Sequence, residues 1–288
     1  MSSMLLLLLI VAVLTMVNSL RLMVVGANGK TGAKVVEIAA KKGIDVTAVT
    51  RSGTLLNPPS FSLSKKINVV AGDVTNPSTV TNPSTMILKG MDAVVFCASA
   101  SKEGGTAQQV DRDGCIRLGE MCIEAKVPRY VVVSSGATSK PWSPVYLFLN
   151  LFGGIMKAKA EAEQAIQTMY KSADTKLGYT IVKPGGLTEE EPVGVRGIEL
   201  NQRDEKSGRV SRWDVAEVCV EAISNSGTSR VSMEVYNKDT GKPLSQVGLA
   251  NILKLKNDAP VAEGKFQRRG ASWKEIFNGL EQDNTTWM

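Results

Sequence analysis

The segment at residues 21–53 most constrains the fold, because it predicts an apolar strand, a glycine-rich turn, an amphipathic helix and a second strand in that order. Residues 22–25 are continuously apolar, as expected of a parallel strand that is buried on both faces, and residues 46–49 resemble them. Two such strands need a helical crossover. Residues 33–42 supply one with an apolar and a charged face, and Gly43 suits its left-handed end. The segment therefore predicts a βαβ unit.

Gly26, Gly29 and Gly32 lie in the turn between the first strand and the helix. Glycine at these positions permits a tight turn, lets a diphosphate approach the backbone, and allows the helix to pack closely against the strand. The N–H groups at the start of the helix would then face the phosphates. A nucleotide triphosphatase loop would need a further glycine where Val24 stands. The turn therefore predicts dinucleotide binding, and its remaining expected cofactor contacts are Asn28, Lys30 and Thr31.

The residues after the second predicted strand indicate which dinucleotide is bound. An acidic residue at this place would hold the adenosine ribose 2′-hydroxyl of NAD, but Arg51 stands there and offers a planar fork to a 2′-phosphate. Lys30 could add charge from the glycine turn. We therefore expect NADP(H) rather than NAD(H), with a solvated loop cation as the alternative reading of Arg51.

Five further stretches predict strands, at 67–74, 91–100, 127–137, 179–187 and 231–237. Helices are expected at 109–126 and 156–170, and a third after Ser211, which forms a capping-box-like pair with Asp214. This order predicts an α/β fold with a Rossmann-like doubly wound parallel sheet, in a single domain with a short helical C-terminal extension.

Domain boundaries follow from the same pattern. Residues 20–238 are expected to form the NAD(P)-binding domain, and 239–288 an extension with modest helical patterns at 245–254 and 273–282. The polar, glycine-bearing stretch 186–210 is expected to be a lid over the substrate. VTNPST occurs twice, at 74–79 and 80–85, which indicates a short duplication inside a surface loop.

The amino terminus predicts a signal peptide at residues 1–19. Positions 1–20 carry no charged side chain, and an apolar run at 4–17 ends in small residues that suit cleavage after Ser19. Secretory entry is then expected, with no transmembrane span in the mature chain. An uncleaved anchor remains open because the basic n-region is nearly absent, and so does a cytoplasmic form starting at Met16 or Met23.

Composition excludes several classes of function. The net charge of +6 comes from scattered lysines and arginines, which argues against a nucleic-acid groove. The chain has no histidine, and its four cysteines form no CxxC pair, so we expect no metal site, no redox dithiol and no disulfide framework. One glycosylation sequon begins at Asn284.

Six segments together resemble the atypical short-chain dehydrogenase/reductases of the NmrA-like group. They are GANGKTG at 26–32, GDVTNPS at 72–78, MDAVVFCAS at 91–99, RYVVVSSGA at 129–137, YTIVKPGGL at 179–187 and SRWDVAEVCVEAI at 211–223. Within that group LNLFGG at 149–154, followed by Lys159, looks most like the NADP-binding part of the redox subunit of the chloroplast inner-envelope import translocon. That closer likeness implies a plastid location as an alternative.

The resemblance also implies roles for single residues. Asp73 and Val74 would border the adenine, Ala98 and Ser99 would line the cofactor, Ser135 would lie near the nicotinamide, and Pro184 with Gly185 would flank the nicotinamide end. Each of these residues also has a plain structural interpretation as a strand end or a turn.

Whether the chain catalyses a reaction depends on its proton donor. The superfamily usually pairs a tyrosine with a lysine one helical turn later, and Lys159 holds the lysine position, but Ile155 replaces the tyrosine. Tyr179 and Lys183 have the same spacing on a strand, where four residues span roughly 13 Å, so they cannot act as that pair.

Three hypotheses remain open. The first is an NADP(H)-dependent reductase of an unidentified small substrate, with Lys159 and an altered donor, which could be Ser135, water or Tyr146. The second is a cofactor-binding redox sensor or scaffold without turnover. The third is a structural or RNA-associated protein, although the sequence contains no basic aromatic patch that would support RNA binding.

Overall fold

The computed structural model describes residues 19–60, 66–76, 88–247 and 266–283. Residues 1–18 of the expected signal peptide, the second copy of VTNPST, most of the helical pattern at 245–254 and the sequon at Asn284 lie outside these residues. Among the residues that are described, no helix combines the length and apolar character needed to cross a membrane.

An eight-stranded sheet forms the centre of the molecule, in the order β3-β2-β1-β4-β5-β6-β11-β8. Every pairing in it is parallel except that of β8 with β11. The first six strands have the Rossmann order, in which two mononucleotide-binding halves meet between β1 and β4. The strands are β1 (Arg21–Val25), β2 (Asp45–Thr50), β3 (Ile67–Ala71), β4 (Ala93–Phe96), β5 (Arg129–Val133), β6 (Gly178–Pro184), β8 (Ile198–Asn201) and β11 (Val231–Asn237).

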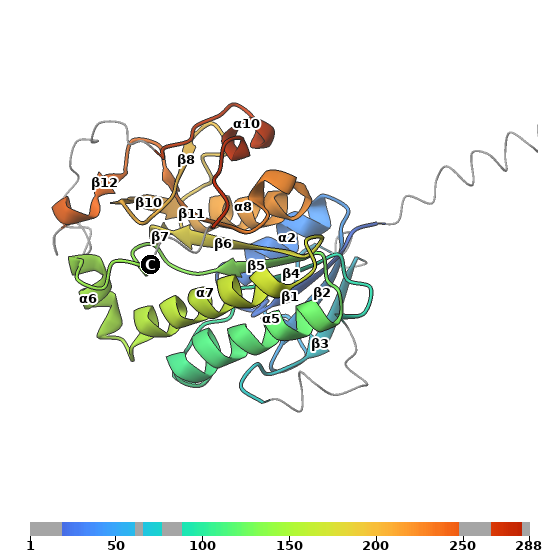
Figure 1. Cartoon of the computed structure of the whole chain (residues 1–288). Helices are drawn as coiled ribbons and strands as arrows, with labels where there is room; N and C mark the ends of the chain where they lie inside the picture. Colours follow the sequence, from blue (N-terminus) through green and yellow to red (C-terminus); the bar gives the residue numbers. More distant parts are fainter. Residues whose placement is uncertain (1–18, 61–65, 77–87, 248–265, 284–288) are drawn as a thin grey trace, which may run out of the picture.

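Helices cover both faces of the sheet, which confirms the doubly wound prediction (Figure 1). On one face, α2 (Gly32–Lys41) and α8 (Arg212–Ser224) cover a core that includes Leu22, Val24 and Val131. On the other face, α5 (Cys115–Glu124) and α7 (Ile155–Ser172) cover Met23, Val25 and Phe96. Alternate strand residues therefore enter different cores, which explains why these strands are apolar throughout.

Residues 186–210 do not form the expected lid, because they build four short strands. One of them, β8, joins the central sheet and buries Ile198 and Leu200 completely. The others are β7 (Gly186–Thr188), which pairs with β10 (Arg209–Ser211), and β9 (Lys206–Ser207), which pairs with β12 (Lys242–Pro243). The apolar alternation of β8 is confined to a short stretch among polar neighbours, which is too little to identify a strand.

The C-terminal extension packs onto this added strand. Arg268 pairs with Leu200, and Ile276 joins the core under α8. The helix expected at 273–282 is shorter in the structure, where α10 spans Trp273–Phe277. Its last residue, Phe277, is buried. The remaining elements are α6 (Pro144–Asn150), η2 (Gln108–Gly114), η3 (Ser226–Thr228) and η4 (Leu244–Gln246).

The start of α8 confirms half of the predicted capping box. The Ser211 hydroxyl accepts a hydrogen bond from the Trp213 N–H, as an N-cap residue should. Asp214 instead accepts the N–H groups of Val193 and Gly194, at 3.0 and 2.8 Å. This carboxylate therefore anchors the loop before β8 rather than closing the cap.

Candidate functional site

The glycine turn after β1 leaves no room for side chains. Gly26 has a φ of +81°, and a Cβ on it would lie 2.6 Å from the Ala98 nitrogen. A Cβ on Gly32 would lie 2.2 Å from the Gly26 carbonyl oxygen. The Gly29 N–H donates to that same carbonyl at 2.9 Å and closes the turn. The first turn of α2 holds no acidic residue, so no carboxylate there would repel an anion at the amino end of this helix.

A cavity of about 540 Å³ opens beside this turn, at the carboxyl ends of β1 to β4. Eight of the predicted cofactor residues line it: Gly26, Asn28, Gly29, Arg51, Asp73, Val74, Ala98 and Ser99. The other predicted residues do not line it: Lys30, Thr31, Gly32, Ser135, Lys159, Pro184 and Gly185. The cavity therefore gathers the first half of the predicted glycine turn together with the predicted residues that follow β2, β3 and β4.

Arg51 and Asp73 flank this cavity from neighbouring strands. Arg51 follows β2, and its guanidinium donates a hydrogen bond to the carbonyl of Glu103. Asp73 follows β3, where its carboxylate accepts the N–H and the hydroxyl of Thr75 at 2.9 and 2.8 Å. In folds of this kind, the residue after the second strand lies near the adenosine ribose, whose 2′ position carries a hydroxyl in NAD and a phosphate in NADP. Arg51 holds that position.

Lys30 lies outside the cavity, although the sequence predicts that it adds charge there. Its side chain is 74% exposed, and its Nζ lies 3.6 Å from a Glu189 carboxylate oxygen. Lys34 and Arg212 also pair with Glu189. The lysine therefore belongs to a surface ion cluster between α2 and the start of α8.

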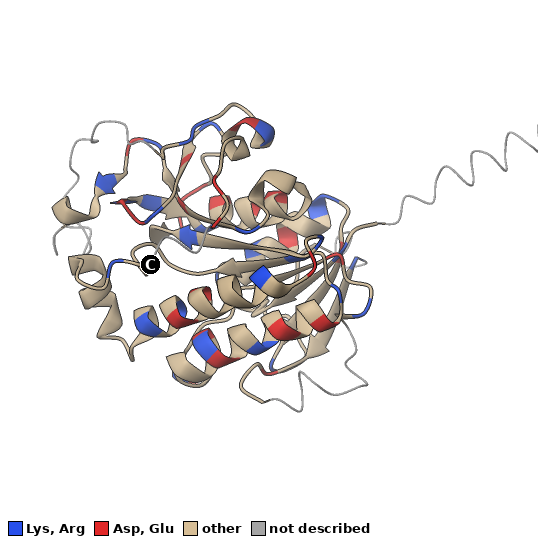
Figure 2. Cartoon of the chain, viewed as in Figure 1, with Lys and Arg blue, Asp and Glu red and all other residues tan. Residues whose placement is uncertain are grey.

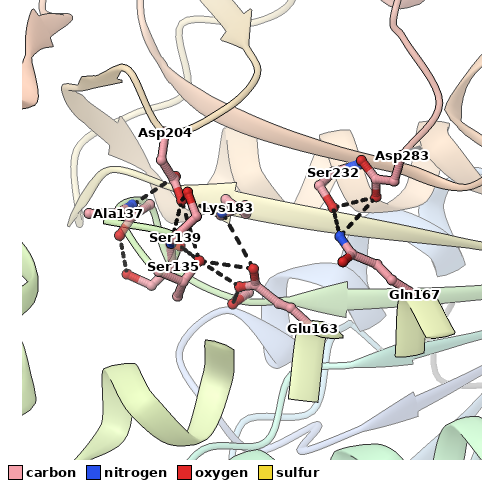
Figure 3. A network of polar contacts seen from close by, with 12 residues as sticks. Ser135, Ala137, Ser139, Glu163, Gln167, Lys183, Asp204, Ser232 and Asp283 are labelled. Atoms are coloured by element: carbon pink, nitrogen blue, oxygen red, sulfur yellow. Dashed lines mark hydrogen bonds and ion pairs between the residues drawn. The ribbon is translucent and has the colours of Figure 1, made fainter. Parts of the chain in front are cut away.

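A buried ion network fills the region beyond the end of β5 (Figure 3). Lys183 on β6 donates to Asp204 and lies 3.4 Å from Glu163 of α7. Asp204 also accepts the N–H groups of Ala137 and Ser139, at 2.8 and 2.9 Å. All three charged side chains are less than a tenth exposed. The network joins the loop after β5 to α7, β6 and the segment after β8.

Burial and pairing act in opposite directions on these groups. Burial opposes ionisation of Asp204, yet Lys183 and the N–H donors hold its pKa below the usual value. Burial raises the pKa of Glu163 by more than Lys183 lowers it. The pKa of Lys183 is raised in spite of burial, chiefly by Asp204. We conclude that Lys183 and Asp204 form an ion pair.

Tyr179 and Lys183 both lie on β6, as predicted, and they face different partners. The Tyr179 hydroxyl donates to Asp283 at 3.0 Å, at the amino end of β6. Asp283 also accepts hydrogen bonds from Ser232 and Gln167. Burial raises the pKa of Asp283, and these donors oppose that rise.

Lys159 lies in a second buried contact, one helical turn into α7. Its Nζ is 2.9 Å from Asp111 and donates to the Val133 carbonyl at 3.4 Å. Asp111 also accepts the Ser99 hydroxyl and the Ala100 N–H, both at 2.8 Å. The first residue of α7 is Ile155, so no hydroxyl occupies the position one turn before the lysine.

Sequence reasoning missed Asp111. The helix predicted at 109–126 begins instead as a π-helix, η2, and Asp111 lies within it with a fully buried side chain. Such π-turns often mark functional sites, but their extra residue per turn leaves no sequence signal. The only available signal was an acidic residue at a position that faces the core.

The other candidate donors and nicotinamide contacts have local explanations. The Ser135 hydroxyl donates to the Gly136 carbonyl at 3.2 Å, and Tyr146 is nearly buried, which raises its pKa. A Cβ on Gly185 would lie 2.2 Å from the Gly208 carbonyl oxygen, so this close approach alone accounts for the glycine. Their roles toward a nicotinamide stay predictions.

The four cysteines are free, and three are fully buried. The fourth, Cys97, is half-buried beside the cavity, and the partial removal of its thiol from water raises its pKa to about 12. A thiol of this kind stays protonated and is a poor nucleophile.

Charged residues of both signs alternate over α5 and α7 in Figure 2, without a single basic face there.

Comparison with known proteins agrees with this geometry. The profile of the NAD(P)H-binding family matches residues 26–226. An uncharacterized chloroplastic protein of Arabidopsis thaliana is 33% identical over 230 residues, covering 76% of this chain and 77% of its own. The chloroplastic protein TIC 62 of Oryza sativa is 26% identical over 83% of this chain, which spans about half (51%) of its length.

Solved structures show the same fold. A putative NAD-dependent epimerase/dehydratase from Bacillus halodurans superposes with a TM-score of 0.60 and 25% identity. The match covers 82% of this chain and all of the bacterial chain. With its glycine turn, its sheet order and these relatives, the chain belongs to the NAD(P)H-binding family, among the NmrA-like atypical short-chain dehydrogenase/reductases.

Proposed function

We propose that this protein binds NADP(H) and acts as an oxidoreductase on a small substrate. The observation that carries the proposal is the cavity beside the glycine turn, which is lined by Arg51 and has no carboxylate side chain directly after β2. The guanidinium there suits two charge-assisted hydrogen bonds to a 2′-phosphate. We assign this role to residues 20–238 and treat 239–288 as an extension.

When bound, the reduced nicotinamide supplies a hydride, and an acceptor that also takes up one proton is thereby reduced by two electrons. Lys159 is the residue we assign to the nicotinamide half, because its ammonium contacts the carbonyl at the end of β5. Ser135, which follows the same strand, is the proposed polar contact for substrate. The proton would come from Ser135, Tyr146 or water.

The choice of cofactor is tested by titrating NADP+ and NAD+ against purified protein. Arg51→Ala should raise the Kd for NADP+ about tenfold or more, since a hydrogen bond to a charged group contributes about 1.5–3 kcal/mol. The Kd for NAD+ should change less than about twofold. Lys30→Ala is the matched control, because that side chain lies outside the cavity, and it should bind both like the native protein. Equal weakening of both dinucleotides by Arg51→Ala would reject the 2′-phosphate assignment.

A redox sensor without turnover is the second candidate. It is favoured by the pairing of Lys159 with Asp111 and by Ile155 at the tyrosine position. NADPH oxidation against a panel of quinones and enones separates the two proposals. Turnover that is lost in Lys159→Ala supports the reductase, whereas tight binding with no turnover on any acceptor supports the sensor.

We further propose a plastid location, supported by relatives that are named as chloroplastic. A full-length fusion to a fluorescent protein, expressed in a plastid-bearing cell, should colocalise with chlorophyll. Accumulation in the secretory pathway would instead favour the signal peptide expected from residues 1–19.

A further inference from the structure

The ion pair between Lys159 and Asp111 lies on a continuous path of contacts from the glycine turn. Gly26 packs against Ala98, and the next residue, Ser99, donates its hydroxyl to Asp111. Asp111 pairs with Lys159, which in turn reaches the Val133 carbonyl at the end of β5. In a sheet of this order the second mononucleotide lies over β4 to β6, so the path runs from the diphosphate to the nicotinamide half.

The pair is well shielded from water. The Asp111 side chain is fully buried, and that of Lys159 is 11% exposed. Charges in such a place act on one another more strongly than they do at a surface. The Lys159 ammonium is therefore cancelled locally by Asp111, and the site presents little net charge from this pair.

The two forms of the cofactor differ in charge in this half alone. The oxidised nicotinamide ring carries one positive charge, and the reduced ring carries none. An unpaired ammonium in the same half would repel the oxidised form and leave the reduced form almost unaffected. A carboxylate that neutralises this ammonium removes that bias.

We propose that Asp111 sets the relative affinity of the site for oxidised and reduced dinucleotide, by cancelling the charge of Lys159. This inference rests on the proposed binding of NADP(H) and concerns the regulation of that same site. With the pair intact, Lys159 adds no bias against NADP+, so the occupancy by NADP+ can rise as the ratio of NADP+ to NADPH in solution rises. Such behaviour suits a reporter of redox state.

The experiment measures the Kd of NADP+ and of NADPH for the full chain by calorimetric titration at pH 8. Asp111→Asn keeps the size of the side chain and an oxygen for Ser99, but removes the charge. It should raise the ratio of the Kd of NADP+ to the Kd of NADPH about tenfold. Lys159→Met should move that ratio in the opposite direction, and the double variant should return it to within about twofold of the native value.

Asp113→Asn is the matched control. It makes the same change of charge in the same helix, at a carboxylate that is 43% exposed and paired with Arg112. The ratio should therefore stay at the native value. A change like that of Asp111→Asn would mean that any nearby charge produces the effect, and would overturn the assignment to Asp111.

The remaining outcomes are equally decisive. Weakening of both cofactor forms by one factor in Asp111→Asn would show that Asp111 only holds the loop at residues 99–100, which overturns the inference. If Asp111→Asn does not fold, Lys159→Met decides, and an unchanged ratio there rejects the inference. Native protein that binds both forms while the variants leave the ratio unchanged rejects the inference alone, whereas native protein that binds neither form rejects the proposed function with it.

Discussion

The two halves of the candidate site are built in different ways. Around β1 to β3 the chain uses glycines, and Gly26 and Gly29 line an open cavity where they carry no side chain to fill it. Around β5 and β6 it buries charges instead, with Lys183 and Asp204 tying separate segments together. The first half is shaped to accept a ligand's charge, whereas the second carries its own charges and their compensation. Substitutions in the first half should therefore weaken dinucleotide binding, whereas substitutions in the second half should lower the stability of the fold.

The largest expected effect is on stability, in the half with buried charges. Asp204→Ala should lower the free energy of unfolding by about 3 kcal/mol or more, because it removes the carboxylate that pairs most closely with the buried Lys183. Chemical denaturation measures this loss. The control is Glu37→Ala, in an exposed pair with Lys41, which should cost less than about 1 kcal/mol. Similar losses in both variants would remove the distinction between the halves.

The next effect is on binding, in the half without side chains. Gly26→Ala would place a Cβ 2.6 Å from the Ala98 backbone, so the turn must move away from its binding position, and we expect a roughly 100-fold weaker Kd for dinucleotide, equivalent to about 2.7 kcal/mol of binding free energy. Gly43 has the same φ of +81°, but a Cβ added there would meet nothing within 4 Å. Gly43→Ala should therefore cost about 1 kcal/mol of stability and leave the Kd unchanged. Equal Kd values for the two variants would contradict the role given to Gly26.

The smallest effect is a dependence on pH. Burial raises the pKa of Glu234 well above its usual value, with Asp204 as the next cause. The folded state therefore binds the proton more tightly than the unfolded chain, so this group's contribution to stability is full below the unfolded pKa, about 4.3, and falls as pH rises toward the folded pKa. Glu234→Gln, which resembles the protonated form, should match the native protein near pH 4 and exceed it by about 1 kcal/mol or more near pH 9.

The exposed Glu124→Gln serves as the control for that pH series, and it should keep the native profile. Denaturation midpoints at several pH values give the comparison. A Glu234→Gln profile parallel to that of the native protein would show that Glu234 does not titrate differently on folding.

The same contrast explains what the sequence can predict. β1, α2 and β2 follow one another directly between Arg21 and Thr50, so their periodicity and glycines specify the turn, and Arg51 and Asp73 can be located because each follows a strand. The ion pairs cannot be found in this way. Lys159 and Asp111 stand far apart in the sequence, and only the packing of α7 against η2 brings them together.

Two wrong predictions have the same origin. The sequence pattern assigns Asp214 to the cap of its own helix, but the folded chain brings Val193 and Gly194 to it. The sequence also assigns β8 to a lid, because the alternation of this short strand acquires its meaning only once β11 lies beside it. Local patterns therefore describe the phosphate-binding half well, while contacts distant in sequence determine the other half.

The contacts of Asp283 have a consequence for the order in which the molecule is made. A ribosome has synthesised every strand from β1 to β5 by Val133, but Tyr179 and Ser232 share a partner that is made only near the other end of the chain. A nascent polypeptide can thus complete β1 to β5, and pair β6 with β5, before Asp283 is available to link Tyr179 to Ser232. A truncation just before Asp283 would leave β1 to β5 intact and remove the carboxylate that links Tyr179 of β6 to Ser232 of β11.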